Sequence, residues 1–481
     1  MSRGSYHDVI VVGSDVAGLM TAGLLAKHGY RVLQIGQGNP GSMYSIQGAL
    51  FPALPTVLPP FGHAPVLDRV LHELGVEDPV HLLGSGDPPL QLVTPRQRID
   101  LVPDRSGLEA ELERSFPTEK KATLEMIDGL RSLDDRFRSE ILSRPHLPPD
   151  SWPEQVKTRR AGERLAHETL PPFSAWPLPL RILASGAGFH SWLHEDPRTL
   201  FVSGHFVQAL LGGPRTVWNF EELVSKAIEK SGCAVEKKTV VQQILTEGRQ
   251  ATGVKTLRGE KTYTCGALLA GLPIGSCLEL FPLDGRHKRL MGAANSVRQQ
   301  GSIFMVNLML PTECLPVGMG KHLLMVRRPD EQLQEGNLIL LHRFDLPDKL
   351  GRSMLSLACR VAYKKRSLGR EYLGPLHKEM IEAATWLIPF LDQFLQSQSS
   401  PFWEGRTDDE PHPNPWSLRP IFECKREVSL SCAVLPGKTP YKNIFFCGPE
   451  TIPGLGVEGS AKTAVQTVDL LTEKLKLKKI L

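Results

Sequence analysis

The pattern of hydrophobic and polar residues at the start of the chain predicts a strand, a tight turn, a helix and a second strand. Val9 to Val12 is a short, wholly apolar run, as expected for a central strand of a parallel sheet. A turn bounded by Gly13 and Gly18 follows, and then a helical pattern from Leu19 to His28 that Gly29 ends. The apolar run from Arg31 to Ile35 completes a unit that is right-handed by default.

The middle of the chain predicts helices and a second sheet. Apolar residues at helical spacing between Leu108 and Arg144 predict a pair of helices, and the two runs around Thr94-Pro95 predict a β-hairpin. Alternating or apolar runs between Ser302 and Tyr363 predict a second sheet. The chain then closes with a strand at 443–447, a glycine-rich turn and a helix from about Gly459. Together these patterns predict an α/β protein.

Length and composition limit the class of protein. With 481 residues the chain is long enough for two or three closely joined domains, and 41% hydrophobic residues is ordinary for a globular protein. A net charge of +4 without a large basic block excludes nucleic acid as an expected partner. Eight scattered cysteines without a C-x-x-C pair, no signal peptide and no apolar run of membrane-spanning length predict a cytoplasmic protein.

The first turn is a damaged dinucleotide-binding motif. In G-x-G-x-x-G the first glycine makes the tight turn, the second lets the pyrophosphate approach, and the third lets helix and strand pack closely. Here Gly13 and Gly18 keep the first and third positions, but Asp15 replaces the second. Gly36 stands where an acidic residue would end the second strand and hold the ribose. The scaffold half of the motif is therefore present and the ligand half is altered.

A second motif lies near the carboxyl end. Asn443 to Ala464 reads as strand, glycine turn and helix, the arrangement that brings backbone amides and a helix start to a flavin. With both motifs in place, the chain resembles the phytoene desaturase / retinol saturase group of FAD-dependent oxidoreductases over nearly its full length. Pro453 to Gly459 matches the P-G-x-G-x-x-G of that family, and 220–280 resembles its middle segment, in which Val241 stands where a backbone meets the adenine.

The resemblance implies a discontinuous Rossmann-like FAD-binding domain (1–105, 215–290 and 415–481) and a substrate domain of mixed sheet and helices (106–214 and 291–414). It implies FAD as cofactor and hydride transfer by the flavin to or from an apolar, isoprenoid- or carotenoid-like substrate, so no catalytic side chain is predicted. We expect no metal. The cofactor-binding residues that it implies are Gly13, Ser14, Asp15, Ala17, Gly18, Gly36, Val241, Gly448, Glu450, Gly454, Leu455, Gly456 and Gly459.

The departures from the family pattern lie at the ligand. A carboxylate about 4 Å from a phosphate costs on the order of 4 kcal/mol at an effective dielectric near 20, and a lost charged hydrogen bond to the ribose adds about 1.5–3 kcal/mol. Together they weaken binding roughly 10³- to 10⁵-fold. Asp15 has a second interpretation, in which its carboxylate caps the helix and fills the place of a phosphate.

Two functions therefore stay open at the sequence level. The first is an FAD-dependent oxidoreductase. The second is a cofactor-free relative that binds a lipid, a prenyl group or a protein partner, as the Rab GDP-dissociation inhibitors use a flavoprotein-like fold without flavin. Glu450 and Glu458 flank the last glycine turn, where a solvated loop or a helix-start role is favoured over a substrate cavity. The tail from Lys474 to Leu481 is either a peripheral membrane contact or a frayed helix end.

Overall fold

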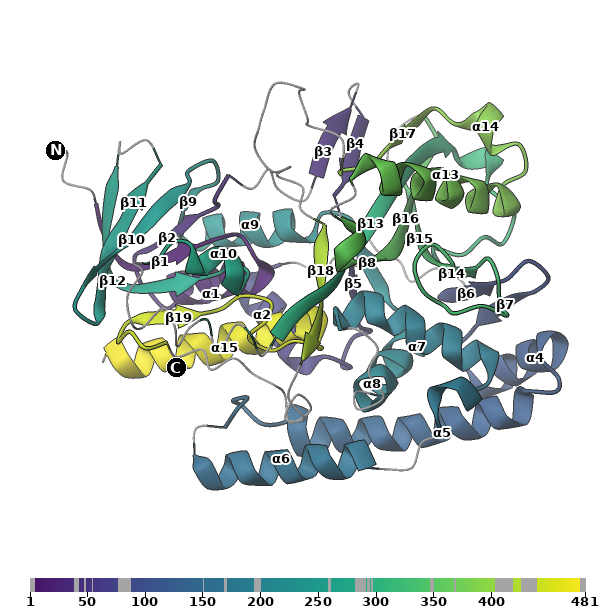
Figure 1. Cartoon of the computed structure of the whole chain (residues 1–481), viewed down its shortest axis with the longest axis horizontal. Coiled ribbons are helices and arrows are strands. Elements are labelled where there is room, and N and C mark those ends of the chain that lie inside the picture. Colours follow the sequence, from purple (N-terminus) through teal and green to yellow (C-terminus); the bar gives the residue numbers. More distant parts are fainter. Residues whose placement is uncertain are drawn as a thin grey trace.

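Two sheets lie side by side, and helices cover them (Figure 1). The computed structural model describes residues 5–38, 43–46, 49–53, 55–76, 88–149, 151–167, 171–193, 200–257, 261–281, 291, 295, 297–346, 350–366, 369–402, 418–424 and 439–475. Mixed sheets combined with packed helices confirm the predicted α/β class, with a Rossmann-like half and a second half built on its own sheet.

The first sheet has seven strands in the order β10-β11-β12-β1-β2-β9, and β19 also pairs with β12. The central strand β1 is parallel to both of its neighbours, and Val9 to Val12 are buried, as the apolar run predicts. The strands are β1 (Tyr6–Val12), β2 (Val32–Ile35), β9 (Ala234–Glu236), β10 (Val241–Glu247), β11 (Gln250–Thr256), β12 (Thr262–Ala270) and β19 (Ile444–Phe446).

One face of this sheet is covered by a layer of four helices. The helix α1 follows β1 directly and is buried along nearly its whole length, because other helices of the layer pack against it as well as the sheet. Residues from both ends of the sequence thus share one hydrophobic core. The helices are α1 (Val16–Lys27), α2 (Pro65–Leu74), α9 (Phe220–Lys230) and α15 (Gly456–Leu475).

The second sheet has eight strands in the order β17-β13-β16-β15-β14-β6-β7, and β18 also pairs with β13. Residues of β13 alternate between two cores: Ile303 and Met305 face the helices α7 and α8, while Phe304 and Val306 face α13. The strands are β6 (Leu90–Val93), β7 (Arg98–Leu101), β13 (Val297–Pro311), β14 (His322–Val326), β15 (Leu338–Asp345), β16 (Arg352–Ala362), β17 (Ser397–Ser399) and β18 (Arg419–Cys424). The predicted hairpin and second sheet are confirmed.

A helical layer covers the outer side of the second half, at the bottom of Figure 1. The predicted helical pair is confirmed as α4 (Arg105–Ser115) and α5 (Lys120–Phe137), which continues into a π-helical turn, Arg138–Leu142. The same side of the second sheet also carries α6 (Trp152–His167), α7 (Leu178–Ser191) and α8 (Leu200–Leu211). The helices α13 (Arg370–Leu387) and α14 (Leu391–Phe394) pack on its opposite face. Shorter elements are β3 (Met43–Ile46), β4 (Ala49–Pro52), β5 (Thr56–Leu58), β8 (Arg215–Val217), α10 (Ile274–Leu278) and α12 (Tyr363–Arg366).

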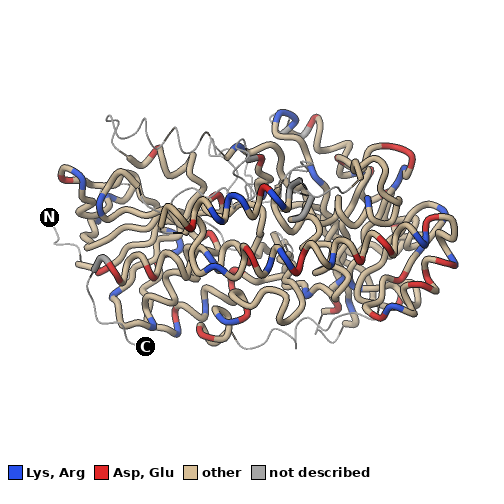
Figure 2. The backbone as a smooth tube through the Cα atoms, turned by 90° about the horizontal axis from the view of Figure 1, so that it is seen from below, with Lys and Arg blue, Asp and Glu red and all other residues tan. Residues whose placement is uncertain are grey.

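Strand pairing crosses the predicted domain ranges. The hairpin β6–β7 and the strand β18 belong to the second sheet, although their residues fall in segments assigned to the dinucleotide-binding domain. The boundaries themselves stay a prediction. Basic and acidic residues alternate over the face seen in Figure 2. Among the described residues no helix is long and apolar enough to cross a membrane, and the tail beyond Leu475 lies outside them.

Candidate functional site

The two glycine turns meet at one edge of the first sheet. The strands β1 and β19 lie on either side of β12 and run parallel to it, so that Val12, Ala270 and Phe446 reach the same edge. A Cβ atom added at Gly18 would lie 3.1 Å from the Cα of Gly271 and 3.9 Å from the Cys447 sulfur. Both ends of the chain therefore converge at the carboxyl ends of the parallel strands, where open α/β sheets place their ligands.

The amino-terminal turn keeps its scaffold. Gly13 has φ of 110°, and a Cβ there would lie 2.0 Å from the Gly271 carbonyl oxygen, so only glycine fits. Ala17 and Gly18 are buried in the first turn of α1, and Ser14 is partly buried beside them. These residues position the turn as the motif predicts. Their role in binding a cofactor stays a prediction.

Asp15 occupies the start of α1. Its carboxylate accepts a hydrogen bond of 3.0 Å from the Ala17 backbone N–H and caps the helix. Burial raises the pKa of Asp15 to about 6, against the opposing effects of the hydrogen bond from Ala17 and of nearby Arg419. At neutral pH a mostly charged carboxylate thus fills the place where this fold puts a phosphate.

Gly36 is enclosed by the chain's own backbone. Its N–H donates a hydrogen bond of 3.0 Å to the Glu236 carbonyl. A Cβ atom at this position would lie 2.6 Å from the Lys237 carbonyl oxygen. A ribose-binding acid at position 36 therefore has no room unless the segment between β9 and β10 moves.

Val241, at the start of β10, is bound by a residue that the sequence did not single out. Gln37 follows Gly36, and its side-chain oxygen accepts a hydrogen bond from the Val241 N–H, while its amide nitrogen donates one of 3.4 Å to the Val241 carbonyl. The backbone edge that the family resemblance assigned to adenine is thus filled from within the chain. No pattern in the sequence could have identified Gln37, because the contact joins residues 204 positions apart.

The carboxyl-terminal turn is closely packed. An added Cβ would lie 2.3 Å from the Leu272 carbonyl oxygen at Gly448, 2.0 Å from the His190 carbonyl oxygen at Gly456, and 2.6 Å from the Ile452 carbonyl oxygen at Gly459. Gly454 and Gly456 also have positive φ angles, of 89° and 54°. Gly454 contacts the side chain of Leu193, and Leu455 is buried in the core. The turn is thus fixed by its packing against the rest of the chain, and the role of these residues beside a flavin stays a prediction.

Glu450 is a buried carboxyl group inside this turn. One of its oxygens accepts a hydrogen bond of 3.1 Å from the Ile274 N–H, and the other has no partner among the described residues. Burial raises the pKa of Glu450 to about 8, so the group is mostly neutral at pH 7. The expectation of a solvated position is wrong for this residue, because α10 and the glycine turn enclose it.

A small cavity lies against the second sheet, next to β5, the end of α7 and the first turn of α15. Its volume is about 30 Å³, which holds one or two water molecules. The side chain of His190 projects into it with an unpartnered Nε2, and burial lowers the pKa of His190 to about 3. The lining is mainly apolar and comprises Pro55, Thr56, Val57, Phe189, His190, Trp192, Ile303, Met305, Leu340, His342, Ser356, Ala358, Arg419 and Val457.

A buried charged network joins three helices nearby. His205 of α8 contacts Asp134 of α5 through Nδ1 at 2.6 Å and Glu458 of α15 through Nε2 at 3.0 Å. The two carboxylates raise the pKa of His205 to about 9, although burial opposes this. Glu458 lies in the first turn of α15, in agreement with the predicted helix-start role, but it is only 2% exposed and therefore not solvated. The sequence signal was a single histidine within a mainly apolar helix.

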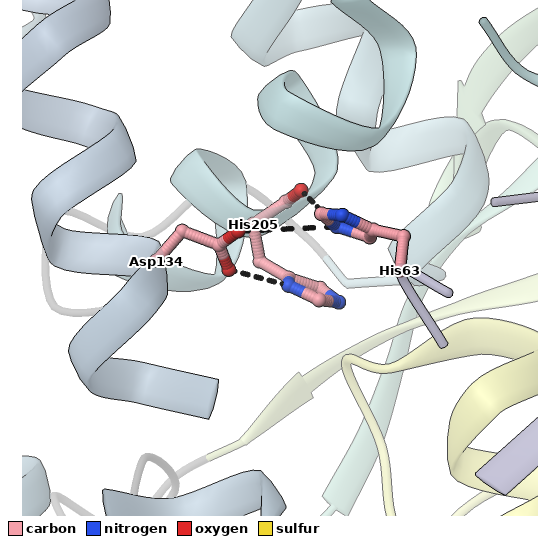
Figure 3. A group of neighbouring side chains, drawn as sticks. All are labelled: His63, Asp134 and His205. Atoms are coloured by element: carbon pink, nitrogen blue, oxygen red, sulfur yellow. Dashed lines mark hydrogen bonds and ion pairs between the residues drawn. The ribbon is translucent and has the colours of Figure 1, made fainter. Parts of the chain in front are cut away.

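His63 completes this group, which Figure 3 shows. Its ring stacks on that of His205 at 4.5 Å, and its Nε2 lies 3.1 Å from the His205 carbonyl oxygen. The potential ligand atoms of His63, Asp134 and His205 lie within 4.8 Å of one another. A metal ion would need a ring lone pair of His205, but with its pKa raised to about 9 the ring is protonated at neutral pH, and its two nitrogens donate to Asp134 and Glu458. The arrangement thus favours an ion pair.

The residues present do not fit FAD in this arrangement. A dinucleotide in this fold needs the helix start for its pyrophosphate, an acid after the second strand for its ribose, and open backbone for its adenine. These places hold the Asp15 carboxylate, the Lys237 carbonyl and the Gln37 amide, respectively. We therefore derive no reaction step through a flavin.

Comparisons with known proteins agree with the fold. No family model and no curated protein match the sequence. Among solved structures, the chain is similar to an oxidoreductase from Methanosarcina mazei (13% identity, TM-score 0.62, 97% of this chain and 100% of that one). It is also similar to putrescine oxidase bound to putrescine, with 15% identity and a TM-score of 0.63. The similarity to cyclohexylamine oxidase from Brevibacterium oxydans has 14% identity and a TM-score of 0.59. Both matches cover 98% of this chain and 100% of the other. At such identities the likeness establishes one thing: the chain has the fold of the flavoprotein oxidoreductases.

Proposed function

We propose that this protein is a cofactor-free relative of the flavoprotein oxidoreductases and that it acts by binding a protein partner. The observation behind this proposal is the closed dinucleotide cleft. The Asp15 carboxylate caps the helix that would receive the pyrophosphate, and the Lys237 carbonyl lies against Gly36. A phosphate about 4 Å from a charged Asp15 costs on the order of 4 kcal/mol at an effective dielectric near 20, or roughly 10³-fold in affinity.

The space inside the molecule favours a partner that binds at the surface. The cavity next to His190, at about 30 Å³, is too small for a lipid or prenyl chain. By contrast, Trp386 is 50% exposed and Phe390 66% exposed, at the end of α13 and the start of α14. Trp386 also lines an open groove of about 320 Å³ together with Arg96 and Arg98. Exposed aromatic and arginine side chains are typical anchors of protein interfaces.

A second candidate is the FAD-dependent oxidoreductase of the phytoene desaturase type, acting on an apolar, isoprenoid- or carotenoid-like substrate. The likeness of fold over 97–98% of the chain favours it. So does the position of the cavity, which the first turn of α15 and His190 both line. This candidate requires the Gln37 side chain and the Asp15 carboxylate to move before FAD can enter.

Cofactor content separates the two candidates. The full chain is purified without added flavin, its visible absorbance is recorded, and FAD is titrated against it by calorimetry and by quenching of flavin fluorescence. We expect colourless protein and no saturable binding. Yellow protein that contains one flavin per chain would overturn the cofactor-free proposal and favour the oxidoreductase.

The partner surface is tested separately. Crosslinking and affinity capture from the source cells compare the wild type with the double variant Trp386→Ser, Phe390→Ser. Trp152→Ser serves as the control, because Trp152 is 75% exposed on α6, away from the groove. We expect a protein that is retained by the wild type and the control but lost from the double variant. Identical capture by all three proteins would refute the assigned surface.

A further inference from the structure

We propose that Gln37 is an internal substitute for adenine, which keeps closed an adenine-binding edge formed by the backbone of Val241. The inference deepens the proposed function and depends on it, since it names the group that closes the cleft. Whereas the Asp15 carboxylate opposes the phosphates and the Lys237 carbonyl leaves no room for a ribose-binding acid at position 36, Gln37 acts on the base itself.

The geometry is that of a two-point contact. Gln37 leaves the end of β2 with φ of 58°, in the left-handed region that residues other than glycine rarely adopt. From there its side chain reaches the start of β10, where its oxygen accepts from the Val241 N–H and its nitrogen donates to the Val241 carbonyl at 3.4 Å. Val241 itself is 2% exposed. Its N–H and its C=O therefore both have the Gln37 amide as hydrogen-bond partner in place of water.

The chemistry of this contact matches that of a base edge. A primary amide presents an acceptor and a donor side by side, and the edge of adenine likewise presents a ring nitrogen beside its amino group. The N–H and C=O of Val241 can therefore bind either the Gln37 amide or the edge of an adenine, but not both at the same time. Removing the amide leaves a buried donor and a buried acceptor unsatisfied, which favours any ligand that restores both hydrogen bonds.

The position gives a clean substitution. Gln37→Gly removes the amide and suits the positive φ, so the variant is expected to fold. Gln37→Ala is a second variant with the same loss of the amide. Gln243→Ala is the matched control, since this glutamine is exposed two residues beyond Val241 on β10.

Adenosine is the probe, because it carries the base without the phosphates that Asp15 repels. Saturation-transfer NMR and calorimetry measure its binding to the wild type, both Gln37 variants and the control, after circular dichroism has confirmed folding. We expect at least about tenfold tighter binding of adenosine to the Gln37 variants than to the wild type and to Gln243→Ala. Inosine, which reverses the donor and acceptor at that edge, should not bind.

The outcomes distinguish this inference from the proposed function. If folded Gln37→Gly and Gln37→Ala bind adenosine no better than the wild type, the substitute role is wrong while the cofactor-free proposal stands. Equal binding of inosine and adenosine would likewise overturn the base-edge contact. Wild-type protein that already holds FAD would overturn both.

Discussion

The strongest stability prediction concerns His205, whose protonated ring lies between two buried carboxylates. The perturbation is His205→Leu, which places an apolar side chain of similar reach within α8 and leaves Asp134 and Glu458 without their common partner. Those side chains are 4% and 2% exposed, so water does not replace the lost contacts. The substitution should therefore destabilise the contacts that join α5, α8 and the first turn of α15.

The magnitude follows from the burial of these charges. Removing one partner of a buried ion pair costs about 3–5 kcal/mol, because the remaining charge is uncompensated. At about 2–4 °C per kcal/mol for domains of this size, the thermal midpoint should fall by about 6–20 °C. A triple variant that adds Asp134→Asn and Glu458→Gln removes both unpaired charges and should recover most of the loss.

The stabilisation that His205 contributes depends on pH. The folded pKa of His205, about 9, lies above its ordinary value of 6.5. The stabilisation is therefore complete below pH 6.5 and is lost as the pH rises through about 9. Between pH 7 and pH 10 the free energy of unfolding of the wild type should fall by more than that of His205→Leu. Urea unfolding monitored by circular dichroism measures both.

Lys121→Leu is the control for loss of a surface ion pair, since Lys121 faces Glu125 at 3.9 Å with both side chains largely exposed. It should leave the thermal midpoint unchanged within error. If His205→Leu shifts the midpoint no more than this control, the charged-network argument is refuted. A wild-type profile that is flat from pH 7 to pH 10 would refute it independently.

Three further predictions concern the cleft. Gly36→Ala should cost about 1–3 kcal/mol in urea unfolding, because its Cβ would lie 2.6 Å from the Lys237 carbonyl oxygen, whereas Gly129→Ala, with open space around it, should not destabilise. Glu450→Gln should abolish the loss of stability that the wild type shows as the pH rises from 4.5 through about 8, and a retained slope would contradict the assignment. In the background of Gln37→Gly, Asp15→Asn should tighten FAD binding at pH 8 by calorimetry, with the difference shrinking below pH 6 as the Asp15 carboxyl is protonated, and equal affinity at pH 8 would contradict this.

Local sequence determined the elements of the fold. The apolar run from Val9 to Val12 is a central strand because its side chains are buried on both faces of the sheet, under four helices on one face and in a core with β10, β11 and α10 on the other. Gly13 and Gly29 end their elements at positive φ, which glycine alone adopts freely. The helical pair after residue 104 followed from apolar spacing in the same way. Each of these signals lies within one short stretch of chain.

Tertiary structure decided which elements are neighbours and what fills the cleft. The hairpin β6–β7 joined the second sheet because β14, more than 200 residues later, offered it a partner strand. From the sequence, Gly36 indicated only that the ribose-binding acid is absent. The tertiary structure adds that the Lys237 carbonyl leaves no room for an acidic side chain at this position. Gln37 and Glu458 gained their partners across the fold, and the physical reason is common to both: contacts between distant segments leave no periodic trace in the sequence.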